Sequence, residues 1–382
     1  MTTGFNAECL RAALRQAVAG KSIVGCVVAV SYGADAIHVE AAGLADREAR
    51  MPMTGEAVFR LASLTKAVIG VLALTMVEHG EIDLADPVTR WLPWFSPVRP
   101  GGEQGKILVA DLLTHRSGLG YGFNEPRGGP YRAAGISDGL DSSGLTLEQN
   151  MRRLAAIPLL DDPGTRWRYS LSTDLLGLLL EVAARRPLGD LVAERILRPL
   201  GMDRTAFIAA SGQALVTPYA DGPETPVRMA KAHAVAMGAG EIRFSPGRAY
   251  DASAFPSGGT GLVGTATDYV RFLDAIRRGG NGILSAAMAR RFATDALDGE
   301  DIGFSGSGMG WGMGAAIMRD PAATGSPLSA GSWLWGGVYG NSYWVDPVRQ
   351  IAVVALTNTA LAGMTGTFPD EIKRAVYAGL EP

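Results

Sequence analysis

Strand-like segments occur near both ends of this chain and enclose a middle section of different character. Residues 24–31 and 37–42 have the pattern of a β-hairpin, and a further strand-like piece covers residues 58–61. Four more strand-like segments follow late in the chain, at residues 311–317, 332–338, 341–345 and 351–357. Between about residues 83 and 240, prolines and glycines instead separate several helical segments.

This order constrains the fold, because terminal segments of one kind that enclose another kind predict pairing of the two ends in one antiparallel sheet. We expect helices at residues 8–19, 64–78, 146–156, 173–185 and 370–377. The predicted fold class is α+β, with an antiparallel β-sheet flanked by helices from both chain ends and a mostly helical domain inserted in the middle. A length of 382 residues allows two domains, which we place at residues 1–83 with 241–382 and at residues 84–240.

The composition excludes several classes of function. Hydrophobic residues make up 47% of the chain and charged residues 19%, which is typical of a globular protein and not of a disordered one. The net charge is -3 and the arginines are scattered singly, so no basic stripe is present for a nucleic-acid backbone. We therefore expect no nucleic-acid partner.

The sequence also predicts a cytoplasmic protein without a membrane partner. Residues 1–10 lack the cationic start and apolar core of a secretory signal. The longest apolar run, residues 67–77, is shorter than the roughly 20 residues that span a bilayer. Cys9 and Cys26 match neither a disulfide framework nor a zinc site, and we expect both thiols to be buried and reduced.

Ser63 and Lys66 form an S-x-x-K pair, which places a hydroxyl and an amine on one face of a helical turn. A serine hydroxyl becomes a nucleophile when an adjacent base takes its proton, and a desolvated lysine amine can be that base. The apolar run at residues 67–77 predicts such desolvation, and a helix start at Ser63 adds the positive end of the dipole. Two simpler interpretations remain open, in which Ser63 caps the helix and Lys66 is a solvated charge.

Tyr169 is a second candidate, because it precedes a predicted helix within the segment W-R-Y-S-L-S. A phenol near a lysine ammonium can ionise or relay a proton, so Tyr169 could share the work of a general base with Lys66. The alternative is a half-buried tyrosine that only packs.

A third candidate is the segment W-G-G-V at residues 335–338. Glycines inside a strand often mark the close approach of another backbone or a ligand. The backbone N–H groups of Val338 and Ser63 could then hold a developing oxyanion. The alternative is a bend in a sheet, with Trp335 in the core.

Residues 135–139 fit the G-x-S-x-G pattern, which would make Ser137 a competing nucleophile. That motif needs a buried strand before it and a helix after it, whereas glycine, proline and serine flank it here, so we assign it to a loop.

The histidines match no metal-binding spacing, and no metal or cofactor is expected; they are His38, His79, His115 and His233. A serine triad assembled in space stays open, although we expect His115 to be a structural loop residue.

Taken in order, these segments resemble the serine β-lactamase-like superfamily, and most closely its family VIII carboxylesterases. These are relatives of class C β-lactamases and D-alanyl-D-alanine carboxypeptidases. The segments are F-R-L-A-S-L-T-K at residues 59–66, L-T-H-R-S-G-L at 113–119, P-G-T at 163–165 before Tyr169, and W-G-G at 335–337. The resemblance implies that Ser63 is the nucleophile and Lys66 its base, with Tyr169 as proton partner. It further implies oxyanion donors at the N–H groups of Ser63 and Val338, and substrate contacts at Trp335, Gly336 and Gly337.

Two departures from the family pattern bear on the substrate. Leu171 replaces the asparagine of the Y-x-N element, and Trp335 replaces the lysine of K-T-G. Without that cation a substrate carboxylate has no partner beside the reacting bond, which favours neutral esters. We expect a serine carboxylesterase that hydrolyses small, short-chain esters through an acyl-enzyme, with a pocket lined by the loops at residues 123–143 and 244–257.

Other activities of the same superfamily remain alternatives. They are β-lactamase, amide hydrolase and acyltransferase activity, since one acyl-enzyme can pass its acyl group to water, an alcohol or an amine. A non-catalytic penicillin-binding or sensor protein is the alternative of another class. The sequence gives no expectation for the oligomeric state.

Overall fold

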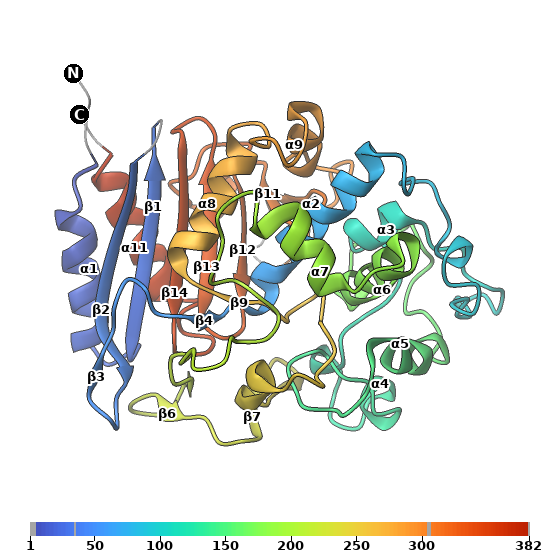
Figure 1. Cartoon of the computed structure of the whole chain (residues 1–382), viewed down its shortest axis with the longest axis horizontal. Helices are drawn as coiled ribbons and strands as arrows, with labels where there is room; N and C mark the ends of the chain where they lie inside the picture. The colour runs from blue at the N-terminus through green and yellow to red at the C-terminus, as the bar shows by residue number, and fades with distance from the viewer. Residues whose placement is uncertain (1–4, 34–35, 304–306, 381–382) are drawn as a thin grey trace.

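The computed structural model describes residues 5–33, 36–303 and 307–380, and an eight-stranded antiparallel sheet is its centre (Figure 1). The strand order is β10-β11-β12-β13-β14-β1-β2-β3. The bounds are β10 Met309–Trp311, β11 Ala316–Met318, β12 Trp333–Gly337, β13 Asn341–Asp346, β14 Ile351–Thr357, β1 Gly25–Tyr32, β2 Ala36–Asp46 and β3 Met51–Pro52.

The two ends of the chain meet inside this sheet. Strand β1 pairs with β14 in antiparallel register, from Cys26 opposite Thr357 to Tyr32 opposite Ile351. Both strands are buried along almost their whole length. The predicted α+β fold, with one antiparallel sheet built from both chain ends, is confirmed.

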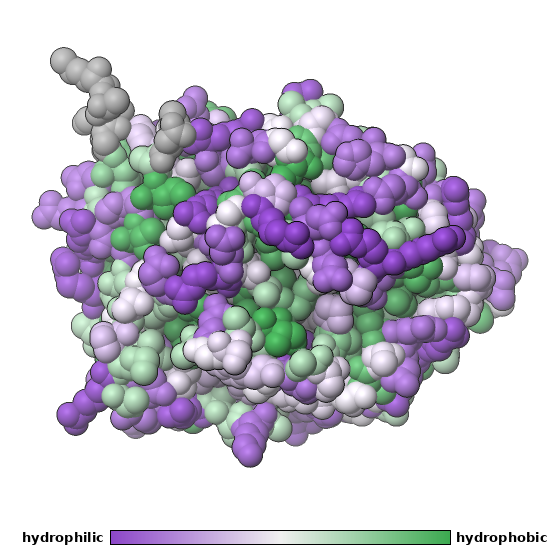
Figure 2. All heavy atoms as spheres, in the orientation of Figure 1, coloured by the Kyte–Doolittle hydropathy of each residue, from purple (hydrophilic) through white to green (hydrophobic). Residues whose placement is uncertain are grey.

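Helices cover both faces of the sheet, which explains why its central strands are apolar on both sides. Helices α1 (Glu8–Ala19) and α11 (Thr367–Ala378) pack against each other on one face, and α8 (Ala266–Arg277) covers the other (Figure 1). Each helix turns an apolar stripe inwards; in α1 this stripe includes Leu10 and Leu14. In the view of Figure 2, hydrophilic and hydrophobic residues alternate over the surface without one continuous hydrophobic area.

Helix α2 (Thr65–Glu78) lies inside the molecule, between α6 (Ser172–Ala184) and α9 (Ala286–Phe292). Its residues from Thr65 to Met76 are all buried, as expected for a helix that is apolar on every side. This burial fixes the position of the segment that leads into α2, which carries Ser63.

The section between the two sheet-forming parts contains short helices and two small hairpins. The helices are α3 (Val109–Leu113), α4 (Pro130–Ala133), α5 (Leu147–Ala155), α6 and α7 (Leu188–Val192). The hairpins pair β5 (Tyr219–Ala220) with β6 (Val227–Arg228) and β7 (His233–Met237) with β8 (Gly240–Phe244). The division into domains at residues 83 and 240 stays a prediction.

Two local predictions were wrong, and one predicted strand is shorter than expected. Residues 311–317 form no single strand, because a turn in which Gly314 adopts a φ of 128° separates β10 from β11. The strand at residues 58–61 shortens to β4 (Phe59–Arg60) and pairs with β9 (Val263–Gly264) outside the large sheet. The thiol of Cys9 is exposed, since Cys9 lies on the outer side of α1, whereas Cys26 is buried as predicted.

No helix in the described part of the chain is both long and apolar enough to cross a membrane.

Candidate active site

Ser63 lies in a tight turn, η1 (Ala62–Leu64), that leads directly into α2. The preceding Ala62 has a φ of 47°, in the left-handed region that non-glycine residues seldom adopt. Such backbone strain costs roughly 1–3 kcal/mol and persists only where the surroundings hold it. Three hydrogen bonds from other elements do so: the Leu61 N–H to the Leu262 oxygen at 2.9 Å, the Tyr269 hydroxyl to the Leu64 oxygen at 2.8 Å, and the Asn341 amide to the Arg60 oxygen at 2.8 Å.

The amine of Lys66 points at the Ser63 hydroxyl from the first turn of α2. Its Nζ lies 3.2 Å from Ser63 Oγ and donates to the Gly259 oxygen at 2.8 Å. Only 1% of Lys66 is exposed, and no side chain caps α2. The two simpler interpretations, a solvated lysine and a helix-capping serine, are therefore wrong.

Tyr169 approaches the pair from the segment before α6. Lys66 Nζ lies 4.7 Å from the centre of the Tyr169 ring, and the phenol oxygen accepts a hydrogen bond from the Trp335 indole N–H at 3.0 Å. Tyr169 is 7% exposed. The sequence candidates Ser63, Lys66, Tyr169 and Trp335 thus meet in one place, although they come from the first, middle and last parts of the chain.

The W-G-G segment is the last part of strand β12, where one edge of the strand is unpaired. Strand β11 pairs with β12 only at Trp333 and Leu334, so the described strands leave the β11 side of residues 335–337 uncovered. A Cβ atom added at Gly337 would lie 2.6 Å from the Leu61 carbonyl oxygen. Glycine at this position lets β12 come close to the turn that carries Ser63.

Val338 follows β12 and lines the same cavity as Ser63. Among the described residues its backbone N–H donates to no protein acceptor. Trp335, Gly336 and Val338 all line the cavity, whereas Gly337 faces the turn. A backbone N–H that has no protein acceptor and lies near a nucleophile is what an oxyanion site requires.

The cavity at Ser63 has a volume of about 210 Å³ and a mostly apolar lining. Phe123 confirms the first of the two loops predicted to line it, but no described residue of 244–257 does so. Its other apolar residues include Met237, Ile302, Met309, Leu334, Met364 and Pro369. The sequence did not indicate these, because they come from segments that meet only when the start of α11 folds over the edge of β12.

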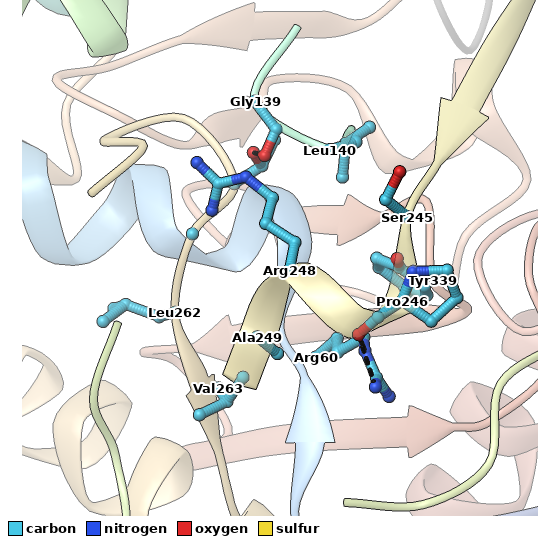
Figure 3. Close-up of a pocket in the computed structure, with 12 residues that line it drawn as sticks. Arg60, Gly139, Leu140, Ser245, Pro246, Arg248, Ala249, Leu262, Val263 and Tyr339 are labelled. Carbon is cyan, nitrogen blue, oxygen red and sulfur yellow. Dashed lines mark hydrogen bonds between the residues drawn. The ribbon is translucent and has the colours of Figure 1, made fainter. Parts of the chain in front are cut away.

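A much smaller cavity near the nucleophile turn has no room for a substrate (Figure 3). Its volume is about 20 Å³, which is room for about one water molecule. Arg248 points towards Gly139, whereas Arg60 points to the opposite end and donates to the Pro246 oxygen at 2.7 Å. The two guanidinium groups therefore do not converge on a common anion.

The residues and their geometry agree with one known family. The family model described as Beta-lactamase matches residues 10–375. This chain belongs to the β-lactamase family.

The proteins similar to this chain include one named as an esterase and one described as a hydrolase. The chain is 41% identical over 374 residues to "Esterase EstB" from Burkholderia gladioli, covering 97% of this chain and 94% of that protein. A solved structure titled "EstCE1, a hydrolase with promiscuous acyltransferase activity" is 39% identical, with a TM-score of 0.93 over 97% of this chain and 98% of the other. Unliganded simvastatin synthase from Aspergillus terreus has a TM-score of 0.76 at 20% identity, over 98% and 99% of the two chains, which shows a shared fold.

Ser137, the competing serine, lies in an irregular segment, as predicted, and it does not line the cavity at Ser63. Its hydroxyl donates to the Asp141 carboxylate and accepts the Gly139 N–H at 3.0 Å. Its own N–H donates to the Asn150 side chain at 2.8 Å. These bonds hold a turn and leave Ser137 1% exposed, with no histidine or lysine bonded to its hydroxyl in the described structure.

His115 lies in a turn after α3, in agreement with the prediction of a structural loop residue, but the sequence did not indicate that it packs against Tyr169. Its ring is 1% exposed and its centre lies 5.0 Å from that of Tyr169, while Nδ1 lies 3.1 Å from Ser170 Oγ. Burial, supported by the Lys66 charge, holds the pKa of His115 well below its usual 6.5, so the ring is neutral at pH 7. No hydrogen bond joins a histidine to Ser63 in the described part of the chain, so no serine triad is formed there.

Tyr121 was also missed. Its ring lies 5.2 Å from Lys66 Nζ on a different side from Tyr169, and desolvation raises the pKa of its phenol well above 10.0. The two neighbouring rings and the Gly259 oxygen all lie close to the amine. Within the described residues, no group of three or more His, Cys, Asp and Glu could hold a metal ion.

Proposed function

We propose that this protein is a serine carboxylesterase that hydrolyses small, short-chain esters through an acyl-enzyme on Ser63. The observation that carries the proposal is the contact of 3.2 Å between Lys66 Nζ and Ser63 Oγ at one end of a mostly apolar cavity. The relative named as an esterase and the solved hydrolase, at 41% and 39% identity, support ester hydrolysis as the reaction.

Acylation begins when Lys66 Nζ, acting as the general base, takes the proton of the Ser63 hydroxyl. The freed oxygen attacks the carbonyl carbon of the ester and forms a tetrahedral intermediate. The N–H groups of Ser63 and Val338 stabilise the negative oxygen of that intermediate. The C–O bond to the alcohol then breaks, and the proton returns to the leaving alcohol through Lys66 and Tyr169.

Deacylation repeats these steps with water as the nucleophile. Lys66 and Tyr169 take a proton from water, and the hydroxide attacks the acyl carbonyl carbon. The bond to Ser63 Oγ breaks, the serine regains its proton, and the carboxylic acid leaves. The hydrogen bond from Trp335 to the phenol oxygen keeps Tyr169 oriented towards this site throughout.

The residues beside the reacting bond support a neutral substrate. Trp335 presents an indole where a lysine would bind a carboxylate, and its N–H is already bonded to Tyr169. Leu171 is fully buried at 0% exposure and has no amide to offer a peptide or β-lactam. These two positions favour ester hydrolysis over β-lactam or peptide hydrolysis.

The proposal is tested by comparing the wild type with Ser63→Ala and Ser137→Ala on p-nitrophenyl butyrate. Loss of the nucleophile should lower kcat by about 10³-fold or more. Ser137→Ala is the matched control, since it removes a buried serine hydroxyl outside the cavity. Full activity in Ser63→Ala would refute the proposal, and loss only in Ser137→Ala would assign the reaction to the loop at residues 135–139.

Mass spectrometry of the same reaction distinguishes the alternatives. Turnover should be accompanied by a transient acyl adduct on the peptide that contains Ser63. A stable adduct without turnover would instead indicate a penicillin-binding or sensor protein. Cephalosporin hydrolysis at a rate comparable to that of the ester would indicate a β-lactamase.

A further inference from the structure

The cavity at Ser63 does not end at the catalytic face of the sheet. Along β12 and β13, Trp335 pairs with Tyr343 and Gly336 pairs with Ser342, so these two pairs point to opposite faces. Both pairs line the cavity. The cavity therefore passes around the free edge of β12 and reaches the face that α11 covers.

A second cavity, of about 230 Å³, adjoins it on that face. The two cavities share the lining residues Met309, Leu334 and Lys373. The lining changes along this path, because the second cavity adds the hydroxyl-bearing residues Thr324 and Ser326 to its apolar residues. An elongated ligand with its ester at Ser63 would thus leave an apolar section and enter a polar one.

Two cations of α11 stand at this polar end. Lys373 lines both cavities and Arg374 lines the second, together with one carboxylate, Asp370. Lys373 contacts Asp370 at 3.2 Å, but Asp370 is 56% exposed and an ion pair of that kind contributes little. The side chain of Arg374 has no ion-pair partner among the described residues. One positive charge is therefore left over, and a guanidinium can bind a carboxylate with two parallel hydrogen bonds.

From this geometry we propose that the enzyme has a distal subsite, formed by Lys373 and Arg374, for a carboxylate at the far end of one arm of the ester. The preferred substrates are esters that are neutral beside the reacting bond and anionic at a distance from it. Half-esters of dicarboxylic acids and acyl esters of ω-hydroxy acids have this chemistry. The subsite rests on the proposed esterase function and adds to it the class of substrate.

Two features together determine where a substrate can carry its charge: position 335 supplies no cation beside the reacting bond, and cations lie at the far end of the two cavities. Trp335 offers no partner to a carboxylate next to the carbonyl, whereas Lys373 and Arg374 attract one that lies beyond the edge of β12. The apolar lining between them selects a hydrocarbon linker.

The test uses two substrate series of increasing chain length. The first compares mono-p-nitrophenyl esters of dicarboxylic acids with p-nitrophenyl esters of simple acids of the same length. The second compares acetate esters of ω-hydroxy acids with acetate esters of the corresponding simple alcohols. The readout is the ratio of kcat/KM for the anionic ester to kcat/KM for its neutral counterpart.

In one of the two series the wild type should prefer the anionic ester by about 3- to 10-fold once the chain reaches the subsite. Lys373→Met and Arg374→Met should each lower this ratio towards 1, since methionine keeps an unbranched stem and removes the charge. Added salt should lower it too. The exposed Lys106 lines neither cavity, so Lys106→Met is the matched control and should leave the ratio unchanged.

The series that shows the preference identifies the arm of the ester that enters the subsite. A ratio at or below 1 at every chain length in both series would overturn the subsite. The subsite would also be overturned if Lys373→Met and Arg374→Met both kept the wild-type preference for the anionic ester. Wild-type protein that hydrolyses no neutral ester would instead contradict the proposed function itself.

Discussion

Replacement of Gly337 by alanine tests whether the approach of β12 to the nucleophile turn supports catalysis. The added Cβ would lie 2.6 Å from the Leu61 carbonyl oxygen, 3.2 Å from Leu64 Cδ1 and 3.3 Å from Ala62 Cβ. The closest of these atoms belongs to the backbone, so it cannot rotate away. Real Cβ contacts stay above 3.0 Å, and the strand and the turn must therefore separate by at least 0.4 Å, the difference between 3.0 and 2.6 Å.

This separation moves the Val338 N–H away from the Ser63 N–H in the proposed oxyanion site. A missing donor costs about 10²- to 10³-fold in kcat, and a misplacement of about 1 Å costs about 10²-fold. We expect kcat to fall by about 10- to 100-fold, with KM nearly unchanged because the apolar lining stays. Overpacking should lower the free energy of unfolding by about 1–3 kcal/mol, which leaves a domain of ordinary stability folded.

The assay measures kcat and KM with p-nitrophenyl butyrate, alongside urea unfolding of the same samples. Gly247→Ala is the matched control, because a Cβ added at Gly247 meets no atom within 4 Å. It should leave both kcat and stability close to the wild-type values. A Gly337→Ala enzyme with kcat within twofold of the wild type would refute the link between this close approach and the oxyanion site.

Two further substitutions probe individual interactions. Trp335→Phe removes the indole N–H that donates to Tyr169 and should lower kcat/KM for p-nitrophenyl butyrate by about 2- to 10-fold, the equivalent of about 0.5–1.5 kcal/mol; an unchanged kcat/KM would show that this bond does not orient the phenol. Burial raises the pKa of the Asp138 carboxyl from 3.8 to about 7. The protonated carboxyl therefore stabilises the fold below pH 4, and this contribution is lost as the pH rises to 7. The free energy of unfolding should fall by up to about 1.4 kcal/mol per pH unit in that range. Asp138→Asn removes this loss, and urea unfolding should show the variant gaining stability relative to the wild type between pH 5 and pH 8. If the difference in free energy of unfolding between variant and wild type were the same at pH 5 and pH 8, the raised pKa of Asp138 would be contradicted.

The parts of the site that the sequence predicted are those with a local geometric signature. Ser63 and Lys66 are three residues apart on a helical turn, and that spacing alone brings the hydroxyl and the amine together. The glycines at residues 336–337 indicated a close approach, and Gly337 does face the nucleophile turn. The order of strands and helices likewise predicted the antiparallel sheet.

The parts that the sequence did not predict depend on long-range packing. His115 and Tyr121 have no local signature of contact with Tyr169 or Lys66, because the contacts arise only when separate loops converge. The lining of the cavity by Met364 and Pro369 depends on how the segment before α11 and the first turn of α11 pack against β12. The single strand predicted at residues 311–317 failed because apolar residues continue through the turn that contains Gly314.

The pairing of β1 with β14 also determines when this enzyme can become active during its synthesis. Cys26 and Thr357 are 331 positions apart, the difference between 357 and 26, so the central strand pair forms only after almost the whole chain has left the ribosome. Until then β1, which is buried along almost its whole length in the folded sheet, has only β2 as a partner, and its other edge is open to aggregation. Long-range pairing of this kind is slow to form. The onset of esterase activity would therefore report closure of the sheet.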